Sequence, residues 1–399
     1  MYQGWIFTLG GGTITSAGSE DAFITKIGPG GNVLWSKRYG DAQSQVPGGV
    51  AIDNLGSTYV TGSFQGAIDL GGGALMSAGG HDVFVAKLDS GGDSVWRKKF
   101  GDAAEQFGVG VATDNLGNAY ITGILQGTAN FGGNPLTSKG QADIFLAKLG
   151  PGGAHSWSTS FGDASGQYAA GIAVDTAGNV VITGYFAGSL DFGGVTTMLM
   201  SAGGLDTFVA RFDTAGVPLW STRFGGPKDD LPAGIAVDAA GNVILTGSFS
   251  GSVDFGKGPL VSAGKEDVFV VKLDPAGTTQ WTKNFGGAGK DQFAAGITTD
   301  SASNISVAFY FNGDINLGGA TLFSMGANDV GVVKLNPLGG HVWSNRFGDV
   351  QNQVTVGIAA YDTKNLLLGG NFTGIVDFGG GQLVNSGGQD AFLVKLLTP

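Results

Sequence analysis

Cysteine is absent from the 399 residues, so neither disulfide bonds nor thiolate metal sites are available. No run approaches the ~18 consecutive apolar residues that a membrane-spanning helix needs. Proline is scarce, at 11 residues, whereas glycine reaches 75. Because 42% of the residues are apolar and 26 are Phe, the chain is not a disordered low-complexity segment, and its glycines must serve in turns. Stability therefore has to come from packing.

Basic residues are also few. Lys and Arg total 21 against 32 acidic residues, a net charge of −11, which opposes binding to polyanions. We therefore expect no nucleic-acid partner. The first residues, MYQGWIFTLGGG, lack the basic and hydrophobic segments of a signal peptide. Residues 2–21 align with residues 63–82, so the chain opens in the middle of a repeat, and we expect it to be a piece of a longer protein.

One segment recurs along the whole chain with nearly constant spacing. It opens with an aspartate, successive copies are 61 to 63 residues apart, and a tryptophan lies 14 residues after each of the first six aspartates. The aspartates are Asp21, Asp82, Asp143, Asp206, Asp267, Asp329 and Asp390, and the tryptophans are Trp35, Trp96, Trp157, Trp220, Trp281 and Trp343. A repeat of fixed length predicts a single domain over residues 1–399, built from equivalent units.

Each repeat contains four short runs of alternating apolar and polar residues, the pattern of β-strands. In one copy they are residues 49–53, 57–64, 82–89 and 94–101. The first two are joined by Asp-x-x-Gly turns such as DNLG, and a Gly-rich segment between the second and third predicts an additional projecting hairpin. No segment shows sustained helical periodicity. The pattern favours an all-β propeller of four-stranded blades over a β-solenoid or a string of sandwiches.

Four sequence blocks carry a family resemblance. They are D-x-F-V-x-K-L at 82–88, W-x-K-x-F-G at 96–101, G-I-A-V-D-x-x-G-N at 171–179 and Y-V-T-G-x-F at 59–64. Together they resemble the SBBP β-propeller repeats of bacterial, mostly extracellular proteins. The resemblance covers essentially the whole chain. It implies that the GIAVD strand is innermost in each blade and the Trp strand outermost, and it implies no catalytic residues.

Counting strands predicts six blades, with seven as the alternative. The blades are expected at about 46–101, 107–162, 168–225, 231–286, 293–348 and 354–396, the last completed by residues 33–40 as a clasp from the N-terminus. Residues 1–27 are then a surplus partial repeat. This surplus strand predicts either a monomer or self-association through an edge strand.

The loops before the inner strands contain a recurrent polar residue, four positions before the inner-strand glycine. Such loops lie around one mouth of a propeller, where ligands commonly bind. This predicts a binding ring formed by Gln45, Gln106, Gln167, Asp230, Gln292 and Gln353. The alternative is that each side chain hydrogen-bonds the adjacent blade and is buried.

Other recurrent residues have structural interpretations. Each repeat-opening aspartate is followed five residues later by Lys or Arg, as in Asp82 and Lys87, which predicts an ion pair or a ring of charges. The tryptophans predict packing between blades, or sugar stacking in a lectin. No nucleophile, phosphate-binding or metal motif occurs, and the three histidines do not converge. No cofactor is expected, although the Asp-rich turns leave calcium open.

The fifth repeat departs from the others. Its second strand, 305–311, reads ISVAFYF, and Gly331 replaces the usual Phe of the third strand. The aromatic patch Phe309, Tyr310 and Phe311 is either a specialised pocket or compensation for the missing Phe, and we favour compensation.

These observations favour a non-enzymatic interaction scaffold that presents loops to a protein or polymer partner, within a secreted or cell-surface bacterial protein. One alternative is a multivalent lectin. The other is a lyase or hydrolase that uses carboxylates such as Asp229 and Asp230 at the channel mouth.

Overall fold

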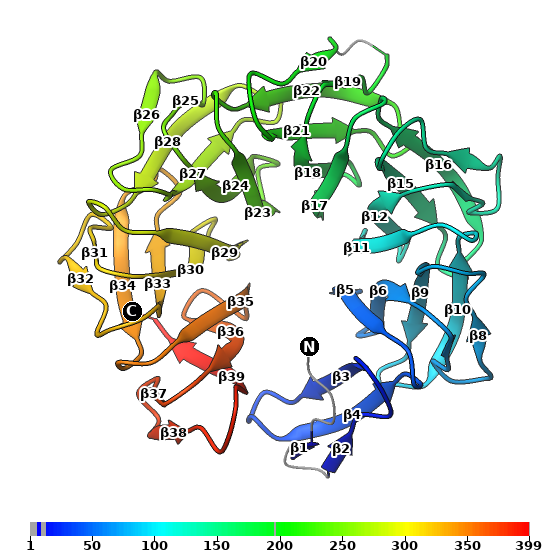
Figure 1. Ribbon diagram of the computed structural model, residues 1–399, viewed down its shortest axis with the longest axis horizontal. Helices are drawn as coiled ribbons and strands as arrows, with labels where there is room; N and C mark the ends of the chain where they lie inside the picture. The colour runs from blue at the N-terminus through cyan, green and yellow to red at the C-terminus, as the bar shows by residue number, and fades with distance from the viewer. Residues whose placement is uncertain (1–5, 9–12, 195–196, 399) are drawn as a thin grey trace. The chain divides into compact units, whose positions relative to one another are not determined.

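The computed structural model describes residues 6–8, 13–194 and 197–398, and all regular structure within them is β-strand and turn. The fold is an all-β propeller with six blades that begin at an inner strand, as predicted (Figure 1). In the described residues five of these sheets have four strands and the last has three. The chain falls into two compact units, one of Met1–Ile182, Gly188–Met198 and Arg211–Leu219, the other of Thr183–Ala187, Leu199–Ala210 and Trp220–Pro399.

The first unit contains the first two blades. Blade 1 consists of β5 (Gln45–Ile52), β6 (Thr58–Phe64), β9 (Asp82–Leu88) and β10 (Ser94–Phe100). Blade 2 consists of β11 (Gln106–Thr113), β12 (Ala119–Leu125), β15 (Asp143–Leu149) and β16 (His155–Phe161). Blade 3, which draws residues from both units, consists of β17 (Gln167–Val174), β18 (Val180–Phe186), β21 (Asp206–Phe212) and β22 (Pro218–Phe224).

The second unit contains the remaining blades. Blade 4 consists of β23 (Asp230–Val237), β24 (Val243–Phe249), β27 (Asp267–Leu273) and β28 (Thr279–Phe285). Blade 5 consists of β29 (Gln292–Thr299), β30 (Ile305–Phe311), β33 (Asp329–Leu335) and β34 (His341–Phe347). Blade 6 consists of β35 (Gln353–Ala360), β36 (Asn365–Phe372) and β39 (Asp390–Leu397).

A small hairpin projects between the second and third strands of every blade, as the sequence predicted. The six hairpins pair β7 (Ala67–Ile68) with β8 (Leu75–Met76), β13 (Thr128–Ala129) with β14 (Leu136–Thr137), β19 (Ser189–Leu190) with β20 (Leu199–Met200), β25 (Ser252–Asp254) with β26 (Pro259–Val261), β31 (Asp314–Ile315) with β32 (Leu322–Phe323), and β37 (Ile375–Asp377) with β38 (Gln382–Val384).

The turn between the first two strands forms as its sequence indicates. In blade 1, Asp53 Oδ1 accepts hydrogen bonds from the backbone N–H groups of Leu55 (3.0 Å) and Ser57 (2.9 Å). Gly56 has a φ of +78°, a conformation that favours glycine. The turn is therefore stabilised by its own side chain and backbone.

The core lies between neighbouring sheets. In the first unit Val111 of β11 packs in one buried cluster with Val83 and Val85 of β9. In the second unit Ile297 of β29 packs in the same way with Val268 and Val270 of β27. In both places the inner strand is buried against the preceding blade, and each Å² of apolar surface removed from water contributes about 25 cal/mol.

The tryptophans also join neighbouring blades. Trp96 Nε1 donates to the Pro151 carbonyl (2.8 Å) and Trp281 Nε1 to the Pro337 carbonyl (3.2 Å). Any side-chain carbon at Gly153, in the same turn as Pro151, would collide with the Trp96 ring, so the indole lies directly on that turn. This is the packing role that the sequence favoured over sugar stacking.

The predicted clasp is wrong for the described residues. Instead of completing blade 6, β4 (Val33–Tyr39) pairs with β3 (Ala22–Ile27). Their register, Ala22↔Tyr39, reproduces the Val83↔Phe100 register of blade 1, so β3 takes the place that the clasp assigned to β39. A short turn closes this hairpin at a lower entropy cost than pairing with a distant strand. Residues 22–27, which were predicted to be surplus, therefore form a strand of this hairpin. In the rest of the predicted surplus segment, β1 (Ile6–Thr8) pairs with β2 (Thr13–Thr15). Residues 1–5 and 9–12 lie outside the described residues.

Within the part of the chain that the structure describes, no helix is long and apolar enough to span a bilayer.

Candidate functional site

The six residues predicted to form a polar ring are buried, with exposed fractions of 0–1%. In the loop that leads into β5, Gln45 Nε2 donates to Asp41 Oδ1 (2.9 Å) and to the Gln65 carbonyl (3.1 Å). Gln353 makes the equivalent bonds in blade 6. These side chains therefore stabilise the lead-in loops. The prediction of a solvent-facing binding ring is therefore corrected, because all six side chains are buried and have a structural role. They are Gln45, Gln106, Gln167, Asp230, Gln292 and Gln353.

The residues on either side of this set face outward instead, because side chains alternate along a strand. Most of them are exposed or half-buried, and they differ from blade to blade. Those before it are Ser44, Glu105, Gly166, Asp229, Asp291 and Asn352, and those after it are Val46, Phe107, Tyr168, Leu231, Phe293 and Val354. The sequence prediction selected the recurrent position and missed its more variable neighbours. The variation of those neighbours between repeats was the signal that could have identified them.

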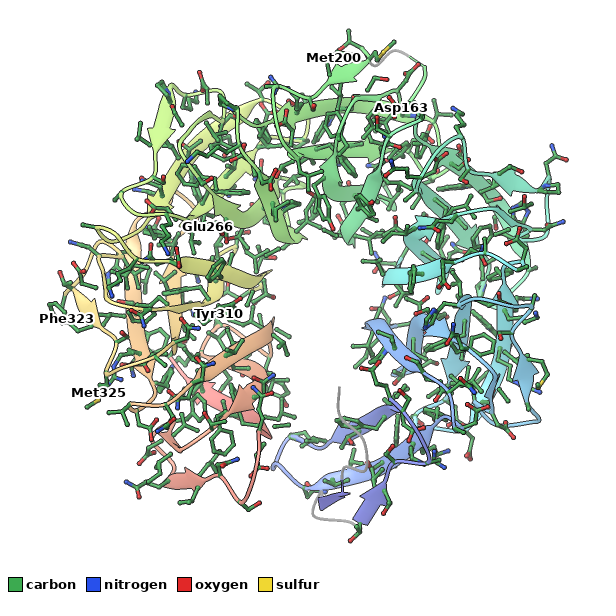
Figure 2. The ribbon with its side chains drawn as sticks, in the orientation of Figure 1. Asp163, Met200, Glu266, Tyr310, Phe323 and Met325 are labelled. Atoms are coloured by element: carbon green, nitrogen blue, oxygen red, sulfur yellow. The ribbon has the colours of Figure 1, made fainter. Side chains whose placement is uncertain are left out.

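The most acidic of these clusters is formed where the lead-in loop of blade 5 meets Glu266 of blade 4. Glu266 and Asp291 are joined by a parallel backbone bridge, and the rings of Phe293 and Tyr310 are 5.2 Å apart. Burial, with Asp291 and Asp229 nearby, raises the pKa of the Glu266 carboxyl. Burial and Glu266 together raise the pKa of the Tyr310 hydroxyl (Figure 2). This surface combines negative charge with two aromatic rings.

The predicted aromatic patch of β30 divides between core and surface. Phe309 and Phe311 are completely buried, whereas Tyr310 is half-buried beside Phe293. Phe309 lies against Gly331, which confirms compensation for the missing Phe.

A different cluster lies at the start of blade 2. His81 Nδ1 is 2.6 Å from Glu105 Oε2, and its ring is 5.1 Å from that of Phe107. The carboxylate and the aromatic ring fix the orientation of the imidazole.

The carboxylates considered for catalysis do not share a cleft. Asp230 is completely buried, and Asp229 Oδ1 accepts a hydrogen bond from the Leu205 backbone N–H (2.8 Å). Burial, followed by the charges of Asp206 and Asp229, raises the pKa of Asp230 to about 7. A solvent-inaccessible carboxyl cannot reach a polymer substrate, so this pair does not form the proposed lyase or hydrolase site.

The predicted pairing of each repeat-opening aspartate with the basic residue five positions later is also wrong. Residues five apart on a strand point to opposite faces. Lys87 instead pairs with the turn residue Asp53 (3.1 Å), and Asp82 pairs with Lys99 of the outer strand (3.0 Å). Both couples are structural ion pairs within a blade.

In blades 1, 2, 3 and 6 an aspartate ties the lead-in loop to the projecting hairpin of its own blade, whereas blades 4 and 5 have Gly226 and Gly287 at this position. Asp41 Oδ2 accepts from the Ala67 backbone N–H (2.8 Å), and Asp163 Oδ2 accepts from both the backbone N–H (2.8 Å) and the hydroxyl (2.7 Å) of Ser189. Burial alone would raise the pKa of Asp163, but hydrogen bonds from Ser189, Ser165 and Gln167 outweigh it and lower the pKa to about 2. Loop and hairpin thus form one braced support.

A shallow depression of about 430 Å³ lies between loop and hairpin in blade 1. It is lined by Gln43, Gln65, Gly66, Ser77, Ala78 and Gly79. The Gly66 backbone N–H donates to Ser77 Oγ (3.0 Å), which holds the two arms of the hairpin together. The lining is polar and open, and Met76 stands exposed beside it.

The second arm of each hairpin presents an outward side chain at one repeat position, which we call the arm residue. The arm residues are Met76, Thr137, Met200, Val261, Phe323 and Val384. The five apolar ones are 59–65% exposed. Met198 and Met325, on the same arms, are each 57% exposed, so all four described methionines stand on these arms. Figure 2 shows Met200, Phe323 and Met325 pointing away from the sheets.

Among the residues that the structure describes, no group of three or more His, Asp or Glu side chains is placed to hold a metal ion. The turn aspartates have protein partners, as in Asp238, which pairs with Lys272 (2.8 Å) and accepts from Asn242 Nδ2 (2.9 Å).

Comparison with known proteins supports a β-propeller repeat protein in general terms. No protein-family model matches the chain. An uncharacterised WD repeat-containing protein of Acanthamoeba polyphaga mimivirus is 26% identical over 235 residues, covering 50% of this chain and 17% of the viral protein. The match therefore spans less than a fifth of that protein's length.

Several solved structures are similar to this chain over most of its length. A protein of unknown function from Dyadobacter fermentans is 9% identical, with a TM-score of 0.43, over 90% of this chain and 95% of its own. An ulvan lyase is 14% identical, with a TM-score of 0.42, over 83% and 82%. A gluconolactonase from Xanthomonas campestris is 12% identical, with a TM-score of 0.35, over 81% and 93%. No activity is transferred from these proteins.

Proposed function

We propose that this β-propeller repeat protein is a non-enzymatic interaction scaffold whose hairpin arms bind a protein partner. The observation that carries the proposal is the exposure of Met76, Met198, Met200 and Met325 on these arms, together with Phe323. Full burial of an exposed side chain of this size stabilises a protein or a complex by ~1.5–3 kcal/mol, so a partner that covers these side chains gains part of this free energy.

The chemistry of the arm residues favours a protein partner over a sugar. Methionine is flexible and polarisable, and it adapts to irregular apolar surfaces of protein partners. Sugar binding instead needs an exposed aromatic ring beside polar groups. The indoles of Trp96 and Trp281 are hydrogen-bonded to the neighbouring blade, so they do not supply that ring. A lectin is therefore the weaker proposal.

The support beneath the arms suits repeated presentation of variable residues. Asp41 in blade 1 and Asp349 in blade 6 brace the loop and hairpin through equivalent hydrogen bonds, while the arm residue changes from Met76 to Val384. A rigid support lowers the entropy lost on binding. Resemblance to SBBP repeats and a secreted or cell-surface location are part of this proposal, and fractionation of the source cells with a specific antibody tests the location.

The test is peptide selection against the intact chain, followed by calorimetric affinity measurement. We expect selected peptides to carry apolar side chains. Changing Phe323→Ser and Met325→Ser together should weaken binding at least tenfold, because the double variant removes the two largest apolar contacts of the blade 5 arm. The control is Leu338→Ser, which removes an even more exposed apolar residue of the same blade outside the hairpin. Equal losses in both variants, or binding of glycans alone, would refute the proposal.

A further inference from the structure

The third strand of blade 6 has a partner along one edge only. Within the described residues β39 pairs with β36, from Asn365↔Leu397 to Phe372↔Asp390, and the sheet order ends there. In blades 1 to 5 the corresponding edge carries the Trp strand. An edge strand presents a row of backbone N–H and C=O groups that can receive another strand.

The complete blades show what this edge accepts. In blade 5, Lys334 of β33 lies opposite Trp343 of β34, and Val330 lies opposite Phe347. The basic residue just before the Phe forms an ion pair with the strand-opening aspartate: Arg346 with Asp329 (2.5 Å), and Lys99 with Asp82 in blade 1 (3.0 Å). The recurring features are a Trp, a basic residue three positions later, and an aromatic residue immediately after it.

The receiving groups for such a strand are present on β39. One face of the strand is packed, with Phe392 and Leu396 in the blade 6 core. On the opposite face Leu393 is 56% exposed, whereas the equivalent Val332 of blade 5 is completely buried. Directly paired residues share a face of a sheet, so a Trp opposite Lys395 would stand on the same face as Leu393 and cover part of it.

The negative charge of Asp390, at the start of β39, also favours an added strand that carries a basic residue. Among the described residues the Asp390 carboxylate accepts hydrogen bonds from the backbone N–H (2.9 Å) and the hydroxyl (3.2 Å) of Ser386, and it has no ion pair. The corresponding aspartates of blades 1 and 5 each face a Lys or Arg. A basic residue at this position of an added strand would therefore meet an unpaired carboxylate.

We propose that the open edge of β39 is a docking site for an extended segment of another polypeptide, with the pattern Trp-x-x-basic-aromatic, added antiparallel in the register of blade 5. The Trp lies opposite Lys395, the aromatic residue lies opposite Ala391, and the basic residue pairs with Asp390. The main-chain bonds supply the affinity, and the Trp and the ion pair supply the specificity. This edge is separate from the hairpin arms.

The test is binding of a synthetic peptide with the sequence of residues 339–349, GGHVWSNRFGD, to the intact chain, measured by fluorescence anisotropy. We expect saturable binding, with slower hydrogen exchange confined to residues 390–397. Asp390→Arg in the protein, or Arg346→Glu in the peptide, should each weaken binding about fivefold, the size expected for a partly exposed ion pair. Combining the two reversed charges should restore most of the affinity. Because this recovery depends on the ion pair, simple damage to β39 by Asp390→Arg cannot produce it.

Three results would overturn the proposal. The first is no saturable binding at millimolar peptide, and the second is equal affinity for the wild-type chain and Asp390→Arg. The third is self-association of the chain that the peptide does not displace, which would assign this edge to a second copy. The experiment is independent of the hairpin arms, because Phe323→Ser should leave the affinity for this peptide unchanged.

Discussion

Phe309 and Gly331 lie directly opposite each other on β30 and β33 and exchange the roles that Gly and Phe have in other blades. In blade 1 the glycine is Gly62 on the second strand and the ring is Phe84 on the third. One ring fills the space between two adjacent strands, and the residue opposite must lack a side chain. The pair thus fills the same core volume as in blade 1, but the ring comes from the second strand instead of the third.

Reversing this pair tests whether volume alone decides the choice. Phe309→Gly should destabilise the chain by at least ~3 kcal/mol, because it leaves a cavity of ring size. Gly331→Phe should also destabilise, because any side chain there collides with the Phe309 ring. The double variant should recover most of the loss in urea unfolding. The matched control is the reverse swap in blade 1, Gly62→Phe with Phe84→Gly. Additive losses would contradict this account.

The buried Asp230 predicts a stability that falls as pH rises. Its pKa is raised from 3.8 to about 7, so the folded state binds the proton more tightly than the unfolded state. The protonated form is favourable below pH 3.8, and stability is lost between 3.8 and 7, by up to about 1.4 kcal/mol per pH unit. Asp230→Gln restores the residue of the other five blades and should remove this loss. Urea unfolding at pH 5 and pH 8 measures it, and an advantage of the variant that does not grow with pH would contradict the assignment.

The lowered pKa of Asp163 predicts the opposite dependence of stability on pH, because the stability that this carboxylate contributes is lost in acid. Its pKa is lowered from 3.8 to about 2, so its contribution is present above pH 3.8 and lost as the pH falls toward 2. Because the carboxylate is partly exposed, solvent screening reduces this contribution to roughly 1 kcal/mol. Asp163→Ala should therefore cost about that amount at pH 7. Thermal unfolding at pH 2 and pH 7 should show the difference shrinking in acid. Asp213→Ala, which removes a half-buried aspartate that caps a turn and does not bind a hairpin, is the control.

Two substitutions of Trp281 should lower the free energy of unfolding by different amounts, because this side chain joins two neighbouring blades. Trp281→Phe removes the N–H that donates to the Pro337 carbonyl and should cost about 1 kcal/mol. Trp281→Ala also removes the ring that lies on the turn at Gly339 and should cost ~3 kcal/mol or more. Denaturant unfolding separates the two losses. Equal costs for both variants would show that the ring contributes nothing to packing.

The fold was predictable because its signals are local. The turn after Asp53 is determined by that side chain and by Gly56, and strand alternation repeats in every copy. The clasp was not predictable on the same grounds. Asp21 and Asp390 open equivalent strands, and sequence alone does not say which of β3 and β39 takes a place beside β4.

The candidate site was harder to predict because adjacent residues on a strand have opposite environments. Gln292 is buried, while its neighbours Asp291 and Phe293 face outward. The repetition of Gln between blades indicated a common structural need, and the functional signal was the variation beside it. The exposure of Met200 and Phe323 depends on a hairpin that projects beyond the sheet, and an apolar run does not by itself distinguish an exposed arm from a buried one.

The central claim is that the exposed hairpin arms bind a protein partner. Hydrogen exchange of the intact chain, with and without the tightest peptide selected against it, tests this claim most directly. We predict slower exchange in hairpins such as 252–261 and 314–325, and unchanged exchange in the turns between the third and fourth strands, such as 274–277. Slower exchange in those turns, with the hairpins unchanged, would contradict it.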